Sequence, residues 1–356
     1  MKKFLLEVII KGGVILSVCV LLTTLLYSIK SDFYDLYELP EIVSRKQNFK
    51  AQSQNINTVF IGSSRIFRHI DPILFDSLTG LRSYNLGYAG LFPFRSYDYL
   101  ENLNLSANPV IKNVFIELSP IALLGQNFNT DPFIYSISPD RYLTVLNFGI
   151  QGPYIKSTRF KYLSGYTLLM AYKYLGVGCS KYLNHLLYGK FDLRVNDDAD
   201  NVYTKGYLSL DDDLALKGGD YENLVARRNE FLESPSKTLA NYTLAYNHYK
   251  TLNFSANNDD FTDYVKVQAH NLSKQGIKVY FIINPRQVYS DLVYLKHQKR
   301  QLDAYKVFDF TDPEKYADLF LEKYSYDRVH LNEDGAELFT KILSREIVKD
   351  SIHVSY

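Results

Sequence analysis

Five short apolar runs, set apart by longer segments, constrain the fold of this chain more than any other feature. Each run is rich in β-branched or aromatic residues: TVFIG (58–62), SYNLG (83–87), NVFIEL (113–118), KVYFIIN (278–284) and KVFDF (306–310). Strands buried on both faces of a parallel sheet have this composition. Between them lie segments such as 259–275, where apolar residues recur near helical spacing before Gly276, a candidate helix end. The alternation predicts an α/β three-layer sandwich with a mostly parallel sheet.

The third and fourth runs are separated by a much longer segment than the others, residues 119–277. A crossover between parallel strands needs only about a dozen residues. We therefore predict a large helical insert at about 119–252, with helices near 155–175 and 241–251. It lies inside one domain that spans residues 55–348, and residues 349–356 are expected to form a C-terminal tail.

Residues 12–29 form an uncharged, mostly apolar run, GGVILSVCVLLTTLLYSI. As a helix this run is about 27 Å long, against ~30 Å for the hydrocarbon core of a bilayer. Lysines precede it, and none follows between Lys30 and Arg45, so the positive-inside rule places the N-terminus in the cytoplasm. A cleaved signal peptide is the alternative, although no small-x-small site follows Thr24.

This arrangement predicts a single-pass protein of the cytoplasmic membrane. Residues 1–30 would hold a cytoplasmic N-terminus and a transmembrane signal anchor, and residues 31–54, polar and mixed in charge, a stalk. The domain that follows is then extracytoplasmic, in the periplasm or at the cell surface. With 40 Lys and Arg against 39 Asp and Glu, the net charge of +1 argues against a nucleic-acid partner.

Cysteine and glycine patterns exclude several kinds of site. The two cysteines cannot form a thiolate zinc site or a disulfide framework. A dinucleotide site is disfavoured because no G-x-G-x-x-G follows the first run. The sequence therefore predicts neither a cofactor nor a metal. The chain has 31 Tyr and 22 Phe and no Trp. Such rings occur in cores, at membrane interfaces and on sugar-binding surfaces alike, so they do not favour any one function.

Two fragments carry candidate chemistry, and the first is Gly62-Ser63-Ser64-Arg65, directly after the first predicted strand. A hydroxyl at this place lies at the carboxyl edge of a parallel sheet, where ligands bind. An N-cap of the following helix is the simpler explanation for either serine.

The second fragment is Asp327-Arg328-Val329-His330, before an amphipathic helix that runs through Val348. An Asp three residues before a His can orient the imidazole and leave its other nitrogen facing a serine. The spacing alone is weak, since Asp350 and His353 repeat it in the last residues, where it looks accidental.

Together the fragments resemble the SGNH (GDSL-like) hydrolase superfamily, in which Gly-x-Ser follows the first strand and Asp-x-x-His lies near the C-terminus. The resemblance makes Ser64 the nucleophile and Asp327 and His330 its partners, with Ser63 where many members have Asp. The segment Asn85-Leu86-Gly87-Tyr88-Ala89-Gly90 is similar to the second block of the family, which implies that the backbone N–H groups of Gly90 and Ser64 form the oxyanion hole.

The third block of the family, Gly-x-Asn-Asp, is missing, because the run 113–118 continues into Ser119-Pro120. Ser119 and the Arg65 side chain are the substitute donors. The loss of one donor typically costs about 100-fold or more in rate. Four residues are thus expected to line the site besides the catalytic ones: Arg65, Asn85, Ser119 and Asn284.

A membrane anchor combined with GSS in place of GDS is similar to SGNH-like proteins that assist O-acylation of cell-envelope polymers, such as the D-alanyl teichoic-acid transfer and alginate acetylation proteins. That resemblance implies a serine esterase or acyltransferase acting on O-acyl esters of an envelope polysaccharide or a similar polymer. Its partner would be a membrane-bound O-acyltransferase. The alternatives are a catalytically inactive scaffold that recruits the same partners and, more weakly, a phosphate-binding module at the helix after Gly62.

Overall fold

The computed structural model describes residues 2–29, 40–91, 96–97, 99–100, 105, 110–119, 164, 168, 205–217, 221–251 and 260–353. The chain divides into two compact units, residues 1–43 with 125–196 and residues 44–124 with 197–356. The predicted helix at 155–175 lies outside the described residues except for Ser164 and Leu168, which are both helical.

The second unit contains a five-stranded sheet in which every neighbouring pair is parallel. Its strands are β1 (Thr58–Ile61), β2 (Ser83–Asn85), β3 (Asn113–Glu117), β4 (Lys278–Ile283) and β5 (Lys306–Asp309). Each lies within one of the five predicted runs, so the α/β class and the parallel sheet are confirmed. The strand order is β2-β1-β3-β4-β5. Because β1 has β2 on one side and β3 on the other, its carboxyl end is the switch point at which such sheets bind ligands.

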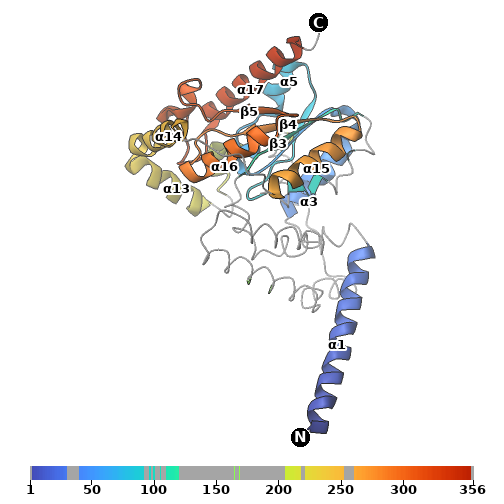
Figure 1. The fold of residues 1–356 in the computed structure, drawn as a ribbon. Helices are drawn as coiled ribbons and strands as arrows, with labels where there is room; N and C mark the ends of the chain where they lie inside the picture. Colours follow the sequence, from blue (N-terminus) through green and yellow to red (C-terminus); the bar gives the residue numbers. More distant parts are fainter. Residues whose placement is uncertain are drawn as a thin grey trace. The chain divides into compact units, whose positions relative to one another are not determined.

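Helices cover the sheet on two sides (Figure 1). On one side lie α5 (Pro72–Thr79) and α17 (Glu333–His353), and on the other lie α15 (Asp260–Lys274) and α16 (Tyr289–Gln301). This arrangement is compatible with a three-layer sandwich. The predicted tail at 349–356 is wrong over its first residues, because α17 continues to His353. Two short 3₁₀ helices, η5 (Ala317–Phe320) and η6 (Glu322–Tyr324), precede α17.

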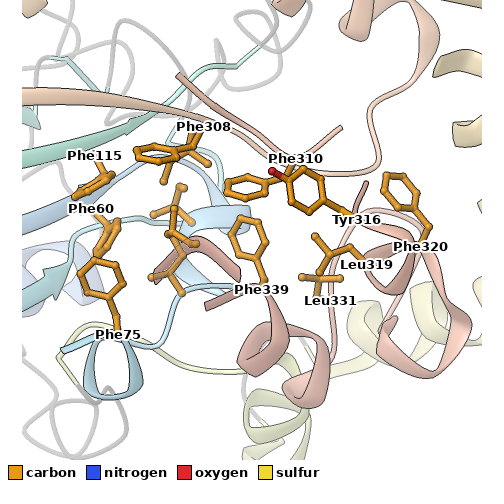
Figure 2. Packing of buried hydrophobic residues seen from close by; sticks show 14 of the residues in the cluster. Phe60, Phe75, Phe115, Phe308, Phe310, Tyr316, Leu319, Phe320, Leu331 and Phe339 are labelled. Carbon is orange, nitrogen blue, oxygen red and sulfur yellow. The ribbon is translucent and has the colours of Figure 1, made fainter. Parts of the chain in front are cut away.

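Aromatic side chains run across one face of the sheet. Phe60 pairs in register with Phe115, and Phe115 with Tyr280. Their rings are stacked, with centroids 5.0 Å and 4.7 Å apart. Phe75 of α5 packs edge-on against Phe60, as Figure 2 shows. Part of the aromatic content that the sequence left undecided therefore builds the core under the sheet.

The second half of the predicted insert belongs to the same unit as the sheet. It forms α12 (Leu210–Leu216), α13 (Tyr221–Glu233) and α14 (Pro235–Lys250), the last of which covers most of the predicted helix 241–251. Phe231 of α13 and Tyr242 of α14 are buried in the main core cluster, together with Leu331. These helices are thus fixed to the same core that carries the loop before α17.

The structure corrects the predicted stalk. Residues 40–52 form α3 (Pro40–Gln52), followed by the 3₁₀ helix η1 (Ser53–Asn55). Phe49 is buried, with its ring centroid 5.5 Å from that of Tyr84 in β2. Arg45 is also buried and donates hydrogen bonds to the carbonyls of Gly87 and Gly206. Residues 44–54 of the predicted stalk are therefore part of the sheet unit.

The first unit contains α1 (Lys2–Ile29), a helix of 28 residues that includes the uncharged run 12–29. Among the residues whose side chains the structure describes, no helix is long and apolar enough to cross a membrane. The membrane anchor stays a prediction.

Candidate active site

A close-packed turn joins β1 to the short helix α4 (Ser64–Phe67). Gly62 begins this turn, and a Cβ atom there would lie 2.5 Å from Cβ of Glu117 and 2.6 Å from Cγ1 of Ile66. Real Cβ atoms do not approach other atoms so closely, so only glycine fits. The turn places the two serines at the carboxyl end of β1, which is the expected ligand-binding edge.

The two serines have different surroundings. Ser63 is 1% exposed and caps α4, because its Oγ accepts a hydrogen bond from the N–H of Arg65 at 3.3 Å. Ser64 is partly exposed, and its Oγ lies 2.9 Å from Nε2 of His330. The cap and the candidate nucleophile are therefore two different residues.

The loop before α17 brings Asp327 and His330 together. Oδ1 of Asp327 accepts hydrogen bonds from the backbone N–H groups of Val329 and His330, each at 2.8 Å. Nδ1 of His330 lies 3.0 Å from both carboxylate oxygens. Asp327 and His330 are both buried, whereas the Ser64 hydroxyl that faces them is partly accessible. This is the geometry that the sequence predicted for Ser64, His330 and Asp327.

Opposing effects set the protonation of this pair. Burial lowers the pKa of His330 below its ordinary value, and the positive charges of Arg227 and Arg65 lower it further. The charge and hydrogen bond of Asp327 act in the opposite direction and raise it, but they do not offset the burial. For Asp327, burial acts to raise the pKa, but the charge and hydrogen bonds of His330 and the charge of Arg227 hold it well below its usual range. At neutral pH the imidazole is therefore a free base beside an ionised carboxylate.

The loop after β2 is hydrogen-bonded to the turn between β1 and α4. The N–H of Tyr88 donates to the carbonyl of Gly62 at 2.9 Å. The Asn85 amide donates to the carbonyls of Ile66 and Ile70, at 2.9 Å each, and its Oδ1 accepts from the N–H of Gly87 at 3.0 Å. The side chain of Asn85, a predicted lining residue, therefore holds the two loops together and does not face substrate.

Gly90 lies in the turn at the end of this loop, with a φ of 73° that glycine adopts without strain. Its assignment as an oxyanion donor stays a prediction. No acceptor within the described part of the chain takes up the N–H of Ser64, the other assigned donor.

A buried acid that the sequence motifs did not indicate contacts the turn between β1 and α4. Glu117, at the end of β3, accepts a hydrogen bond from the N–H of Ser63 at 2.5 Å and one from Nδ2 of Asn284 at 3.0 Å. Nε of Arg65 lies 3.3 Å from its Oε1. Two of the predicted lining residues, Arg65 and Asn284, therefore meet at Glu117, while Ser119 is buried two residues further on. The sequence signal for Glu117 was a charged residue inside the mostly apolar run NVFIEL.

Two further residues contact the Asp-x-x-His loop, and neither was among the site residues predicted from the sequence. Arg227 of α13 donates from Nη2 to Oδ2 of Asp327, and the same nitrogen lies 2.7 Å from Nδ1 of His330. His69, which follows α4, accepts a hydrogen bond at Nε2 from the N–H of Leu331 at 3.1 Å. Both hold the segment that carries the candidate base.

The arrangement is suited to nucleophilic chemistry at a hydroxyl. A hydroxyl, a neutral imidazole and an ionised carboxylate are in contact, in that order, at a sheet edge. No cluster of three or more metal-ligating side chains occurs among the described residues. Comparisons of the chain with protein-family models and with curated proteins find no match.

Proposed function

We propose that this protein is a membrane-anchored, extracytoplasmic serine acyl hydrolase or acyltransferase that acts on O-acyl esters of a cell-envelope polysaccharide or a similar polymer. The observation that carries the proposal is the 2.9 Å contact between Oγ of Ser64 and Nε2 of His330, with Asp327 on the other ring nitrogen. The strand order β2-β1-β3-β4-β5 supports a three-layer fold of the flavodoxin-like or SGNH kind.

The chemistry follows from the order of these contacts. Ser64 attacks the ester carbonyl while Nε2 of His330 takes the hydroxyl proton, which gives a tetrahedral intermediate. Its collapse breaks the ester bond, and His330 returns the proton to the departing alcohol, leaving an acyl group on Ser64. Water, or a hydroxyl of a second polymer, then attacks this acyl-enzyme with His330 as the base. Asp327 orients the imidazole and stabilises its charged form.

Three donors are assigned to the oxyanion of the intermediate. Two are the backbone N–H groups of Ser64 and Gly90, each contributing about 3 kcal/mol when well placed. The third is the guanidinium of Arg65, in place of the family's missing Asn. Glu117 contacts Nε of Arg65, and the structure gives no acceptor for the Nη groups of Arg65 among the described residues. The side chain is 9% exposed beside the serine, so its charge is little screened.

The proposal places the catalytic domain at the outer face of the cytoplasmic membrane. The uncharged run 12–29, preceded by Lys2, Lys3 and Lys11, would be the anchor. A domain tethered in this way is suited to receive acyl groups from a membrane-bound O-acyltransferase and to pass them to a polymer. Neither nucleic acid nor a cofactor is part of the proposal.

Covalent labelling tests the proposal directly. The full-length protein, purified in detergent, should react with a fluorophosphonate probe, and mass spectrometry should find the adduct on Ser64, because only an activated serine attacks such a phosphorus centre. Denatured protein is the control and should stay unlabelled. Native protein that is not labelled would favour the inactive scaffold, and an adduct on Ser63 would contradict the assignment of the nucleophile.

The pH dependence of hydrolysis should follow His330. Only the neutral imidazole is a base, so activity is lost as the pH falls through its pKa, which burial lowers below the ordinary 6.5. The acid limb of kcat/KM for p-nitrophenyl acetate, measured from about pH 4 to about pH 8, should therefore have its midpoint below that value. A midpoint above the ordinary histidine value would show that another group is the base.

A further inference from the structure

We propose that Arg227 is a positioning residue for this site: its guanidinium, presented by α13, fixes the second oxygen of the Asp327 carboxylate against the ring of His330. The inference rests on the proposed function and concerns the same site. Nothing in the sequence motifs points to this residue.

The hydrogen bonds of Asp327 show what Arg227 adds. A carboxylate accepts about four hydrogen bonds, two on each oxygen. Oδ1 is filled by the backbone N–H groups of Val329 and His330, each at 2.8 Å. Oδ2 has no backbone donor among the described residues and is shared by Arg227 and Nδ1 of His330. Without Arg227, only the ring that Asp327 must orient would hold that oxygen.

The helix that carries Arg227 is firmly attached to the rest of the site. Leu224 and Phe231, three residues before and four after Arg227, are on the same face of α13 and are 2% and 3% exposed. The hydroxyl of Tyr326, next to Asp327, donates to the carbonyl of Leu224 at 3.2 Å. The side chain of Arg227 is itself 33% exposed, and that of Asp327 is 4% exposed. The anchored helix α13 therefore holds Arg227 in place while its side chain reaches the buried carboxylate of Asp327.

Arg227 also acts on the charge of the ring. Its Nη2 lies 2.7 Å from Nδ1, where a permanent cation opposes protonation of His330. The other charged or titratable groups that face this histidine are Asp327 on its own loop, Arg65 on α4, His69, and Arg286 after β4. Of these, Asp327 favours the imidazolium and Arg65 opposes it. Removal of Arg227 thus has two separable consequences, a looser carboxylate and a more basic imidazole.

Three variants of the full-length protein separate these consequences. In Arg227→Gln, the plateau of kcat should fall about 10- to 100-fold because the carboxylate is less well placed. The acid limb should move up by about one pH unit because the nearby positive charge is gone. Arg227→Lys keeps the charge, so its acid limb should stay in place. Arg228→Gln is the matched control: Arg228 is the next residue on α13, its guanidinium contacts Tyr326 rather than Asp327 or His330, and neither quantity should change.

A second readout does not depend on activity. In protein with isotope-labelled histidine, His330 can be assigned among the 7 histidines by the loss of its signal in His330→Gln. Its NMR titration should show the same upward shift in Arg227→Gln. A shift without ester hydrolysis by the wild type would support the role of Arg227 and contradict the proposed function. Hydrolysis with an unshifted titration, or a plateau that rises in Arg227→Gln, would overturn the role of Arg227.

Discussion

Ser64→Ala should lower ester hydrolysis by roughly 10⁴- to 10⁶-fold, the range seen when a serine nucleophile is removed from a complete triad. The physical reason is that Ser64 Oγ is the hydroxyl that lies 2.9 Å from Nε2 of His330. With alanine, the imidazole has no hydroxyl to deprotonate and no acyl-enzyme can form. Steady-state hydrolysis of p-nitrophenyl acetate by the full-length variant measures the loss.

Ser63→Ala is the matched control for this change. Ser63 caps α4 and is 1% exposed, so its loss should lower the free energy of unfolding by about 1 kcal/mol and leave hydrolysis nearly unchanged. Thermal unfolding of both variants separates the two effects. Activity that survives Ser64→Ala and disappears in Ser63→Ala would show that the nucleophile is wrongly assigned.

Asp327→Asn should lower hydrolysis by about 10⁴-fold, although the side chain keeps nearly the same shape. Nδ1 of His330 lies 3.0 Å from both carboxylate oxygens. An amide that turned its NH₂ group toward Nδ1 would stabilise the tautomer with its proton on Nε2, and that tautomer cannot accept the proton of Ser64. The ion pair with Arg227 is lost as well. Comparison of kcat for the variant and the wild type at neutral pH measures the effect.

The chain offers a control with the same sequence spacing. Asp350 precedes His353 by three residues, but it lies in α17 and forms an ion pair with Lys306. Asp350→Asn should leave kcat unchanged, because an exposed ion pair contributes little and has no contact with the site. Equal losses in both variants would mean that the effect of Asp327→Asn comes from a general change in charge or stability.

The sheet and the three central residues could be predicted because their signals are local. Strands buried on both faces of a parallel sheet are rich in β-branched and aromatic residues, and the five runs have this composition. Ser64 lies close behind the first run, and Asp327 and His330 are only three residues apart in the sequence. The carboxyl-edge rule for parallel sheets applied to Ser64, and the resemblance to the SGNH superfamily then paired Ser64 with His330.

The remaining parts of the site depend on contacts between distant segments. Arg227 is one of 40 basic residues and lies 100 positions from Asp327, so no spacing marks it. Phe49 looked like part of a polar stalk because the residues around it are charged, and only its contact with Tyr84 explains its burial. Glu117 differs, since an acid within an apolar strand is visible in the sequence and calls for a buried partner.

The distance in sequence between the serine and its base has a consequence for how the protein is made. Ser64 and His330 are 266 residues apart, at nearly opposite ends of the sheet unit. At synthesis rates of 5–20 residues per second, the serine emerges from the ribosome roughly 10 to 50 s before the histidine. During that interval Ser64 is an ordinary, unreactive hydroxyl. On the proposed mechanism, the nascent chain cannot be acylated at this position, and Ser64 becomes reactive only when the loop that carries His330 has docked.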